Sequence, residues 1–151
     1  MPKTSKPSRV KIRRARSSDA GRLAVLSGEL GYPATPGDMK GRLSRLKPAS
    51  DNAVFVAEND KREVIGWLHV SVTLLLEVPL RAEVNGLVVS EGHRSRGAGA
   101  ELLQAAERWA QSRKCLSMSV RSNVIRDRAH KFYERHGYEH YKTQKAFRKP
   151  L

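Results

Sequence analysis

The stretch from Val88 to Leu103 constrains the fold of this chain most, because an apolar strand runs into a basic turn and then into a helix. Gly97 and Gly99 stand in that turn, and glycines let a ligand approach the backbone without a Cβ atom in the way. Successive N–H groups of such a turn, with the first N–H groups of the helix, converge on one point where a polyanion can bind. The same turn also serves simply to join a strand to a helix, so by itself it supports both interpretations equally.

Two common anion-binding motifs do not fit this turn. A P-loop requires Lys followed by Ser or Thr after its last glycine, whereas Ala100 and Glu101 stand there. A dinucleotide-binding fingerprint requires a third glycine where this chain has Leu102, and an acidic residue near Ser119, where none stands. The spacing therefore excludes both motifs.

The pattern that remains is Arg-x-x-Gly-x-Gly, formed by Arg94, Gly97 and Gly99 after a Val-Val strand. It resembles motif A of the GNAT superfamily of N-acetyltransferases, in which the turn holds the pyrophosphate of acetyl-CoA. Two further segments strengthen the resemblance. Residues 82–87 are similar to the family strand that leads into motif A, and Asn123 followed by Ala-x-x-Phe-Tyr-Glu and Gly-Tyr is similar to motif B.

The resemblance implies an enzyme that moves an acetyl group from acetyl-CoA to a primary amine by direct attack in a ternary complex. Glu83 is the candidate base, acting directly or through water, with Glu77 in reserve; the alternative role for Glu83 is an ion pair with an arginine. Tyr133 matches the family tyrosine that protonates the CoA thiolate. Its helical spacing with other apolar residues also suits a core tyrosine.

The resemblance also assigns the acetyl-CoA contacts. The main chain of residues 87–89 would pair with the pantetheine amides, and the glycine turn would hold the pyrophosphate through backbone N–H groups. Asn123 would contact the pantetheine or order nearby water, or would cap a helix instead. The predicted co-substrate-binding residues are Leu87, Val88, Val89, Arg94, Arg96, Gly97, Ala98, Gly99, Ala100 and Asn123.

The cysteine and the histidines indicate neither covalent nor metal chemistry. The single Cys115 lies away from every motif, so an acetyl-cysteine intermediate is not expected. His136 and His140 are four residues apart but lie on either side of Gly137, which should end the helix and separate them. We therefore predict no metal site and no metal cofactor.

The chain is predicted to form one domain. Its 151 residues suit a single core, with residues 1–9 as a disordered basic tail and residues 10–151 as one acetyl-CoA-dependent N-acetyltransferase domain. One cysteine allows no internal disulfide, and neither a membrane-spanning stretch nor the apolar core of a signal peptide is visible. We expect a cytoplasmic protein without membrane contact.

The pattern of apolar and turn residues predicts an α+β fold. Strands are expected near residues 10–15, 53–57, 64–75, 81–89, 116–121 and 138–147. Helices are expected from the cap at 17–19 to 31, from 35 to 48, from 97 to 113 and from 125 to 135. The GNAT resemblance implies a mixed, mainly antiparallel sheet with helices on both faces and a splayed central parallel strand pair.

The formal net charge of +14 and the pI near 10.5 indicate an anionic partner or a solvated basic surface, and both remain open. The basic residues are spread along the chain, and no zinc finger, basic zipper or aromatic RNA signature is present. The alternative function is therefore an acetyl-CoA-binding module, associated with nucleic acid or ribosomes, that acts on a protein amine. Nothing in the sequence identifies the acceptor, which is an amine-bearing small molecule or protein. A monomer and a homodimer are equally compatible with the sequence.

Overall fold

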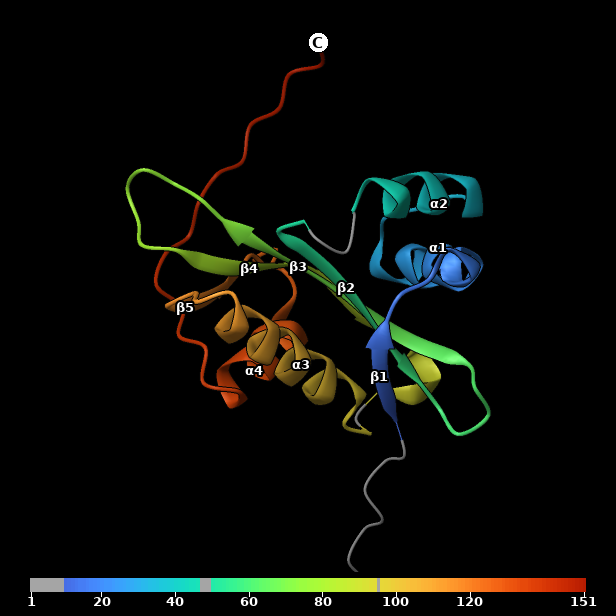
Figure 1. Ribbon diagram of the computed structural model, residues 1–151. Helices are drawn as coiled ribbons and strands as arrows, with labels where there is room; N and C mark the ends of the chain where they lie inside the picture. Colours follow the sequence, from blue (N-terminus) through green and yellow to red (C-terminus); the bar gives the residue numbers. More distant parts are fainter. Residues whose placement is uncertain (1–9, 47–49, 95) are drawn as a thin grey trace, which may run out of the picture. The chain divides into compact units, whose positions relative to one another are not determined.

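The computed structural model describes residues 10–46, 50–94 and 96–151 (Figure 1). The tail predicted over residues 1–9 lies outside the described residues. The chain forms two compact units, which meet in the sequence between Val120 and Arg121. The first unit contains the sheet, and the second contains one helix.

The sheet has five strands that follow one another in chain order (Figure 1). The strands are β1 (Lys11–Arg14), β2 (Asn52–Glu58), β3 (Val64–Thr73), β4 (Arg81–Val89) and β5 (Ser117–Val120). The first four are antiparallel neighbours, and β5 runs parallel to β4. The mainly antiparallel sheet with one parallel pair confirms the predicted fold class. That pair is the last in the strand order of the described residues, not central.

Three helices belong to the first unit: α1 (Ala20–Leu30), which follows a 3-10 turn, η1 (Ser17–Asp19), then α2 (Pro36–Arg45) and α3 (Ala98–Ser112). A capping box opens α2. The Thr35 hydroxyl accepts a hydrogen bond from the N–H of Asp38 at 3.0 Å, and the Asp38 carboxylate accepts one from the N–H of Thr35 at 3.0 Å. The start of α2 predicted at Thr35 or Pro36 is therefore confirmed.

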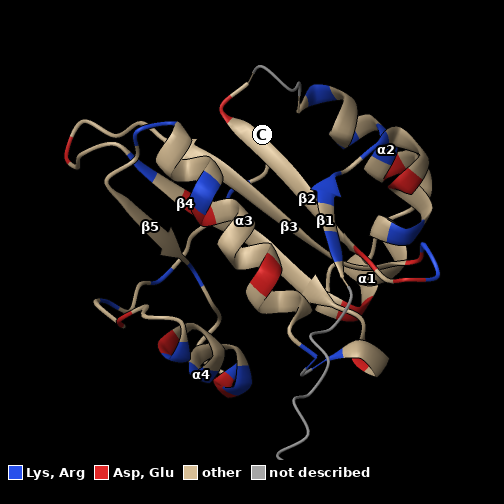
Figure 2. Cartoon of the chain, turned by 60° about the horizontal axis from the view of Figure 1, so that its bottom comes forward, with Lys and Arg blue, Asp and Glu red and all other residues tan. Residues whose placement is uncertain are grey.

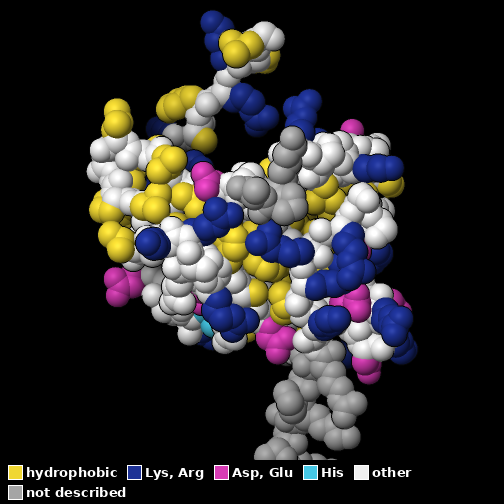
Figure 3. All heavy atoms as spheres, in the orientation of Figure 1, with side chains coloured by type: hydrophobic (Ala, Val, Ile, Leu, Met, Phe, Trp, Pro, Cys, Tyr) yellow, Lys and Arg dark blue, Asp and Glu magenta, His cyan; other side chains and the backbone are white. Residues whose placement is uncertain are grey.

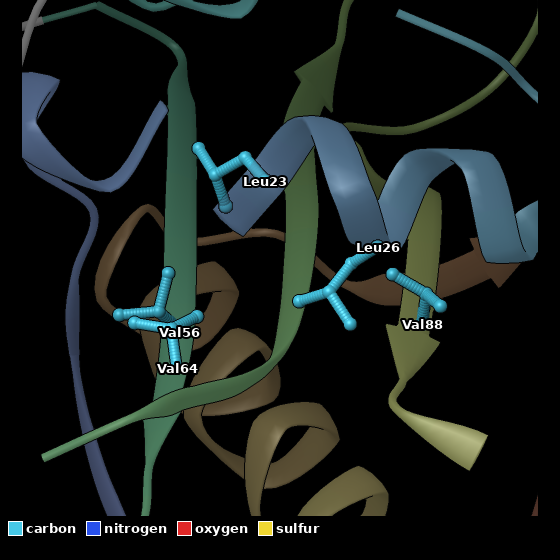
Figure 4. Packing of buried hydrophobic residues seen from close by; sticks show 5 residues of the cluster. All are labelled: Leu23, Leu26, Val56, Val64 and Val88. Carbon is cyan, nitrogen blue, oxygen red and sulfur yellow. The ribbon is translucent and has the colours of Figure 1, made fainter. Parts of the chain in front are cut away.

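Apolar side chains fill both faces of the sheet. Figure 4 shows Leu23 and Leu26 of α1 lying over the strands, next to Val56, Val64 and Val88. On the other face, α3 packs on β2, β3 and β4. Its buried residues include Leu102, Leu103, Ala106, Trp109 and Ala110. The predicted placement of helices on both faces is confirmed.

A small ionic network ties β1 to the start of α1 and to β2. The Nη1 and Nη2 atoms of Arg13 donate hydrogen bonds to the two carboxylate oxygens of Asp19 at 2.8 and 3.0 Å. Its Nε atom donates to Glu58 at 2.9 Å. Asp19 also accepts a hydrogen bond from the backbone N–H of Arg16 at 2.7 Å. Burial by itself would raise the pKa of Asp19, but the hydrogen bonds from Arg13 and Arg16 outweigh it and lower the pKa below its usual value.

We expect Asp19→Asn to lower the free energy of unfolding at neutral pH by about 2 kcal/mol, because it leaves a partly buried guanidinium without its bidentate partner. The lowered pKa means that Asp19 stabilises the fold above its unfolded-state pKa of about 3.9 and that this stabilisation is lost as the pH falls through the folded-state pKa. Urea unfolding between about pH 7 and pH 3 should therefore show a weaker acid dependence in the variant. Asp60→Asn, at an exposed turn residue, is the matched control. Equal stability of Asp19→Asn and the control would contradict the prediction.

The second unit contains α4 (Asp127–Arg135). The turn before it is held by Asn123, whose side-chain oxygen accepts a hydrogen bond from the N–H of Ile125 at 3.2 Å and whose carbonyl accepts one from the N–H of Arg126 at 3.0 Å. After the helix, Gly137 has a φ of +89°. The helix predicted over 125–135 is therefore confirmed, two residues shorter at its start.

The final strand predicted over residues 138–147 is wrong: these residues, all of which the structure describes, form no strand. Each potential face of the segment contains mostly charged or polar residues with one or two apolar ones, so neither face offers a continuous apolar stripe to bury. Tyr141 and Phe147 are accordingly 64% and 91% exposed. Without this strand, β5 ends the described strand order.

Candidate active site

Strand β4 loses its parallel neighbour halfway along its length. The pairing with β5 runs from Arg81 opposite Ser117 to Val84 opposite Val120 and goes no further. Within the described part of the first unit, no strand pairs with residues 85–89 on that side. Pairing ends here because β5 itself ends at Val120, and the open edge of β4 can accept the amides of an extended ligand in the manner of an added strand.

A β-bulge marks the point of separation. On β3, His69 lies opposite Gly86 and Val70 lies opposite Val84, so Asn85 is one extra residue in β4. Gly86 has no room for a side chain, because a Cβ atom there would lie 2.8 Å from a ring carbon of Trp67. The bulge bends β4 just where its open edge begins.

The open edge leads directly into the glycine turn. After β4 the chain forms a 3-10 turn, η2 (Glu91–His93), and the Nε atom of Arg94 donates a hydrogen bond to the carbonyl of Val89 at 3.2 Å. Gly97 has a φ of +88°, in the left-handed region that favours glycine, and is the N-cap of α3.

The start of α3 presents its first N–H groups to the turn. The first hydrogen bond of the helix runs from the N–H of Glu101 to the carbonyl of Gly97 at 3.0 Å. The N–H groups of Ala98, Gly99 and Ala100 come before it and have no acceptor within the helix. The positive end of the helix dipole adds to them, so the turn suits an anion. Arg96 is exposed beside it, and Ser95 lies outside the described residues.

Glu83 lies inside the paired half of β4. It is 8% exposed and stands opposite Ser71 of β3 and Ser119 of β5, two residues before the bulge. Glu77 is exposed in the connection between β3 and β4. Of the two carboxylates, only Glu83 is buried at the place where β4 and β5 separate.

Tyr133 and Asn123 belong to the second unit. The Tyr133 ring packs edge to face against Phe132, with centroids 5.3 Å apart, and against Tyr138 at 5.8 Å. Burial raises the pKa of Tyr133 to about 12, against the smaller opposing effect of the positive charge of Arg126. The hydroxyl therefore keeps its proton at neutral pH.

The predicted site residues thus fall into two groups. Glu83, the strand residues 87–89 and the turn residues that the structure describes lie along one continuous stretch of the first unit. Asn123 and Tyr133 lie in the second unit, in the turn before α4 and within α4.

Comparison with known proteins decides the family. A model described as the acetyltransferase (GNAT) family matches residues 27–138 of the chain. The chain belongs to this family. It is an N-acetyltransferase of the GNAT type, and thus an acyltransferase.

A sequence relative agrees with this assignment, and solved structures share the fold. The GNAT chain is 29% identical over 132 residues to the uncharacterized N-acetyltransferase YhfO of Bacillus subtilis (strain 168), covering 85% of this chain and 89% of YhfO. A transcriptional regulator from Bacillus halodurans C-125 has a TM-score of 0.79 and 25% identity, over 91% of this chain and 99% of that one. The aminoglycoside N-acetyltransferase AAC(6')-Iy in complex with CoA has a TM-score of 0.84 over 97% of this chain and 98% of that one. At 19% sequence identity, the likeness to this neighbour shows a shared fold.

Two residues beside the turn of this GNAT protein were not predicted from the sequence. The Nδ1 atom of His93 and the Oε2 atom of Glu101 are buried and have no hydrogen-bond partner among the described residues. Such atoms are costly unless a ligand or water completes their bonding. Neither atom could be identified from the sequence, because His93 matches no metal-ligand spacing and Glu101 resembles an ordinary residue of the first helical turn.

Two further features concern metal binding and membrane-spanning helices. Among the described residues, no three His, Cys, Asp or Glu side chains cluster closely enough to hold a metal ion. None of the helices in the described ranges has the length and apolar character that crossing a membrane requires.

Proposed function

We propose that this GNAT protein transfers the acetyl group of acetyl-CoA to a primary amine by direct attack in a ternary complex. The observation that supports this most is the open edge of β4, which runs without interruption into the Gly97 turn and the N-terminus of α3. In the reaction, the amine nitrogen attacks the thioester carbonyl carbon, a C–N bond forms, the C–S bond breaks, and the thiolate takes up a proton.

The open edge and the turn suit two parts of acetyl-CoA. The backbone of Leu87, Val88 and Val89 pairs with the pantetheine amides, and one N–H group there polarises the thioester carbonyl. The pyrophosphate sits on the backbone N–H groups of the turn and of the first turn of α3. The turn residues in this role are Arg94, Arg96, Gly97, Ala98, Gly99 and Ala100. The bound CoA in the AAC(6')-Iy neighbour supports a similar site here.

The turn also offers a partner that the family resemblance did not suggest. The buried Nδ1 atom of His93 has no partner in the described chain, and a phosphate oxygen would complete its bonding. Beside an anion-binding turn, a buried polar atom without a partner in the protein is expected when the bound ligand supplies its hydrogen bond.

Three side chains complete the mechanism. Glu83 takes the proton of the ammonium group, directly or through water, and Tyr133 donates its proton to the CoA thiolate. Asn123 contacts the pantetheine in addition to holding the turn before α4. The match to the GNAT family covers residues 27–138 and so crosses the boundary between the units, which supports one acetyltransferase domain over residues 10–151.

An amine panel tests the proposed function. Purified protein and acetyl-CoA are mixed with neutral, anionic and cationic amines and with peptides that have a free N-terminus, and CoA release is measured. The net charge of +14 repels polycations, so we expect aminoglycosides and polyamines to be the poorest acceptors. No acetylation of any amine, by CoA release and by mass spectrometry, would contradict the proposal.

We expect Glu83→Gln to lower kcat about 10-fold at neutral pH, because the amide cannot accept the ammonium proton. The loss should shrink as the pH rises toward about 10, where an alkyl amine with a pKa of about 10.4 becomes neutral without help. The kcat is measured against pH with the best amine of the panel, and CoA affinity is measured by calorimetry.

Glu77→Gln is the matched control, since it removes the same charge from an exposed position. If Glu77→Gln lowered kcat and Glu83→Gln did not, the base would be Glu77. If neither variant changed the pH profile, the assignment of a carboxylate base would be wrong.

A further inference from the structure

An open groove of about 390 Å³ lies between β1 and α3, on the sheet face that α3 covers. We call it the β1–α3 groove. Its lining residues are Ile12, Arg14, Phe55, Ala105, Arg108 and Trp109. In the view of Figure 3, hydrophobic side chains are exposed near the middle of this face, with Lys and Arg side chains around them.

The groove is separate from the turn that holds the proposed pyrophosphate site. Arg108 follows Ala98 by ten residues along α3, which corresponds to about 15 Å at the rise of an α-helix. Figure 2 shows basic positions on both β1 and α3, the two elements that border the groove. The acidic residues of α3, Glu101 and Glu107, do not line it.

Pairing between two strands fixes one arginine in place. Arg14 lies directly opposite Phe55 in the pairing of β1 with β2, and its guanidinium carbon is 5.0 Å from the centre of the Phe55 ring. The guanidinium therefore lies over the Phe55 ring, and Arg14 as a whole is exposed. A planar group held in this way can stack a second planar group on its free face.

A second arginine is held in the same manner at the end of α3. The guanidinium carbon of Arg113 is 5.3 Å from the centre of the Trp109 ring, its Nη2 atom donates to the carbonyl of Ser50 at 2.9 Å, and its Nη1 atom is 3.6 Å from Asp51. Arg113 is thus already paired, and it adds positive potential close to Arg14.

The positive charge of the groove is not neutralised within the described part of the chain, where neither Arg14 nor Arg108 forms an ion pair. Burial and the charge of Arg113 both lower the pKa of Arg14, which shows that like charges are held near one another there. An anion bound in the groove would relieve this repulsion.

We propose that the β1–α3 groove binds single-stranded nucleic acid, with phosphates on Arg108 and Arg14 and a base stacked on the Arg14 guanidinium. The groove is open to solvent, as an extended strand requires, and the apolar residues of its lining, among them Phe55 and Trp109, suit the unpaired base of a single strand. The overall charge of +14 attracts a polyanion to the protein, and Arg14 and Arg108 supply positive charge in this groove. An acidic peptide shares the charge but has no planar base for the stacked guanidinium.

The test measures the binding of a fluorescein-labelled single-stranded RNA of about 12 nucleotides, a length that single-strand sites cover, by fluorescence anisotropy. The double variant Arg14→Gln/Arg108→Gln removes both groove charges. The control double variant Arg42→Gln/Arg45→Gln removes the same charge from exposed positions on α2. The affinity of each protein for CoA, from calorimetry, shows that the variants are folded.

We expect the full chain to bind the RNA at about 150 mM salt, and log Kd to rise linearly with log salt concentration. The groove variant should bind at least about 10-fold more weakly, and its salt slope should fall by about 1.4, which is 0.7 for each lost phosphate contact on a single strand. The control should lose less than about 2-fold. Single-stranded DNA of the same sequence should compete about as well as RNA, because the groove offers contacts to phosphate and base.

Three results would overturn the proposal. Equal losses in the groove and control variants would mean that net charge alone attracts the RNA. Better competition by a duplex than by a single strand would exclude base stacking. Displacement by a poly-glutamate peptide at the same charge concentration would identify the groove as a site for acidic peptides. None of these results bears on acetyl transfer, which the amine panel tests separately.

Discussion

Replacing Tyr133 with phenylalanine is expected to lower kcat about 100-fold, at the lower end of general acid–base effects, and to leave the affinity for CoA unchanged. Phenylalanine keeps the ring that packs against Phe132 and Tyr138 and removes only the hydroxyl. Steady-state kinetics with the best amine of the panel measure kcat, and single-turnover kinetics show whether chemistry limits it.

The pH dependence gives a second measure of the same role. A general acid must be protonated, and its contribution is lost as the pH rises through its pKa. Since the pKa of Tyr133 is raised to about 12, the wild-type kcat should show no tyrosine-dependent decline up to about pH 10, the ordinary tyrosine pKa.

Tyr141→Phe is the matched control, because Tyr141 is 64% exposed in the same unit. It should keep full activity. Equal kcat in Tyr133→Phe and wild type, with chemistry limiting, would mean that Tyr133 contributes packing alone.

Replacing Gly97 with valine is expected to weaken CoA binding about 100-fold while the domain remains folded. At a φ of +88°, a β-branched residue costs about 1–3 kcal/mol of backbone strain, and relaxing that strain moves the N–H groups that the turn presents. The new side chain also stands where the ligand approaches. Calorimetric titration with CoA measures the loss.

Two further variants separate the causes. Gly97→Asn adds a side chain that tolerates left-handed backbone, so it should bind CoA more tightly than Gly97→Val. Lys114→Val places a β-branched residue at a φ of +62° just beyond the opposite end of α3, and should lower stability without changing CoA affinity. Unchanged CoA affinity in Gly97→Val would remove the turn from the proposed site.

The elements best predicted from the sequence are those that local chemistry determines. Thr35 and Asp38 form the capping box that opens α2, and Arg81–Val89 is the strand expected between Pro79 and the glycine turn. In each case the residues that decide the boundary are neighbours in the sequence.

The ends of some elements depend on pairing with a neighbouring strand, which the sequence alone does not show. The strand expected to reach residue 75 ends at Thr73, because Thr73 is the last residue with a partner, Arg81, on β4. Beyond it Leu74 and Leu76 are 74% and 111% exposed, so an apolar run that looked like buried strand lies in the connection to β4. The point at which β4 loses its pairing with β5 is visible only in the structure in the same way.

The candidate site likewise contains features that could be predicted from the sequence and features that could not. The glycine turn could be found because its residues are contiguous, and Glu83 could be proposed because the resemblance to the GNAT family places a glutamate at the start of the strand that leads into that turn. The contact of Arg14 with Phe55 could not be found from the sequence, because it joins residues that are 41 positions apart and depends on the register of β1 with β2. The buried Nδ1 atom of His93 likewise becomes visible only in three dimensions.

The extra residue in β4 reverses the face of the sheet to which alternate side chains of the strand point. Alternation would put Val84 and Val88 on one face, but Asn85 interrupts it, so the first half of β4 and the second half direct their even-numbered side chains to opposite layers. Val84 and Val88 are 2% and 4% exposed, and Val88 packs in the α1 layer. Inserting or deleting one residue at the bulge would turn the side chains of half of β4 to the opposite face of the sheet. The exposed connection before β4 can vary in length without this effect. Homologous strands are therefore best aligned from the bulge outward in both directions.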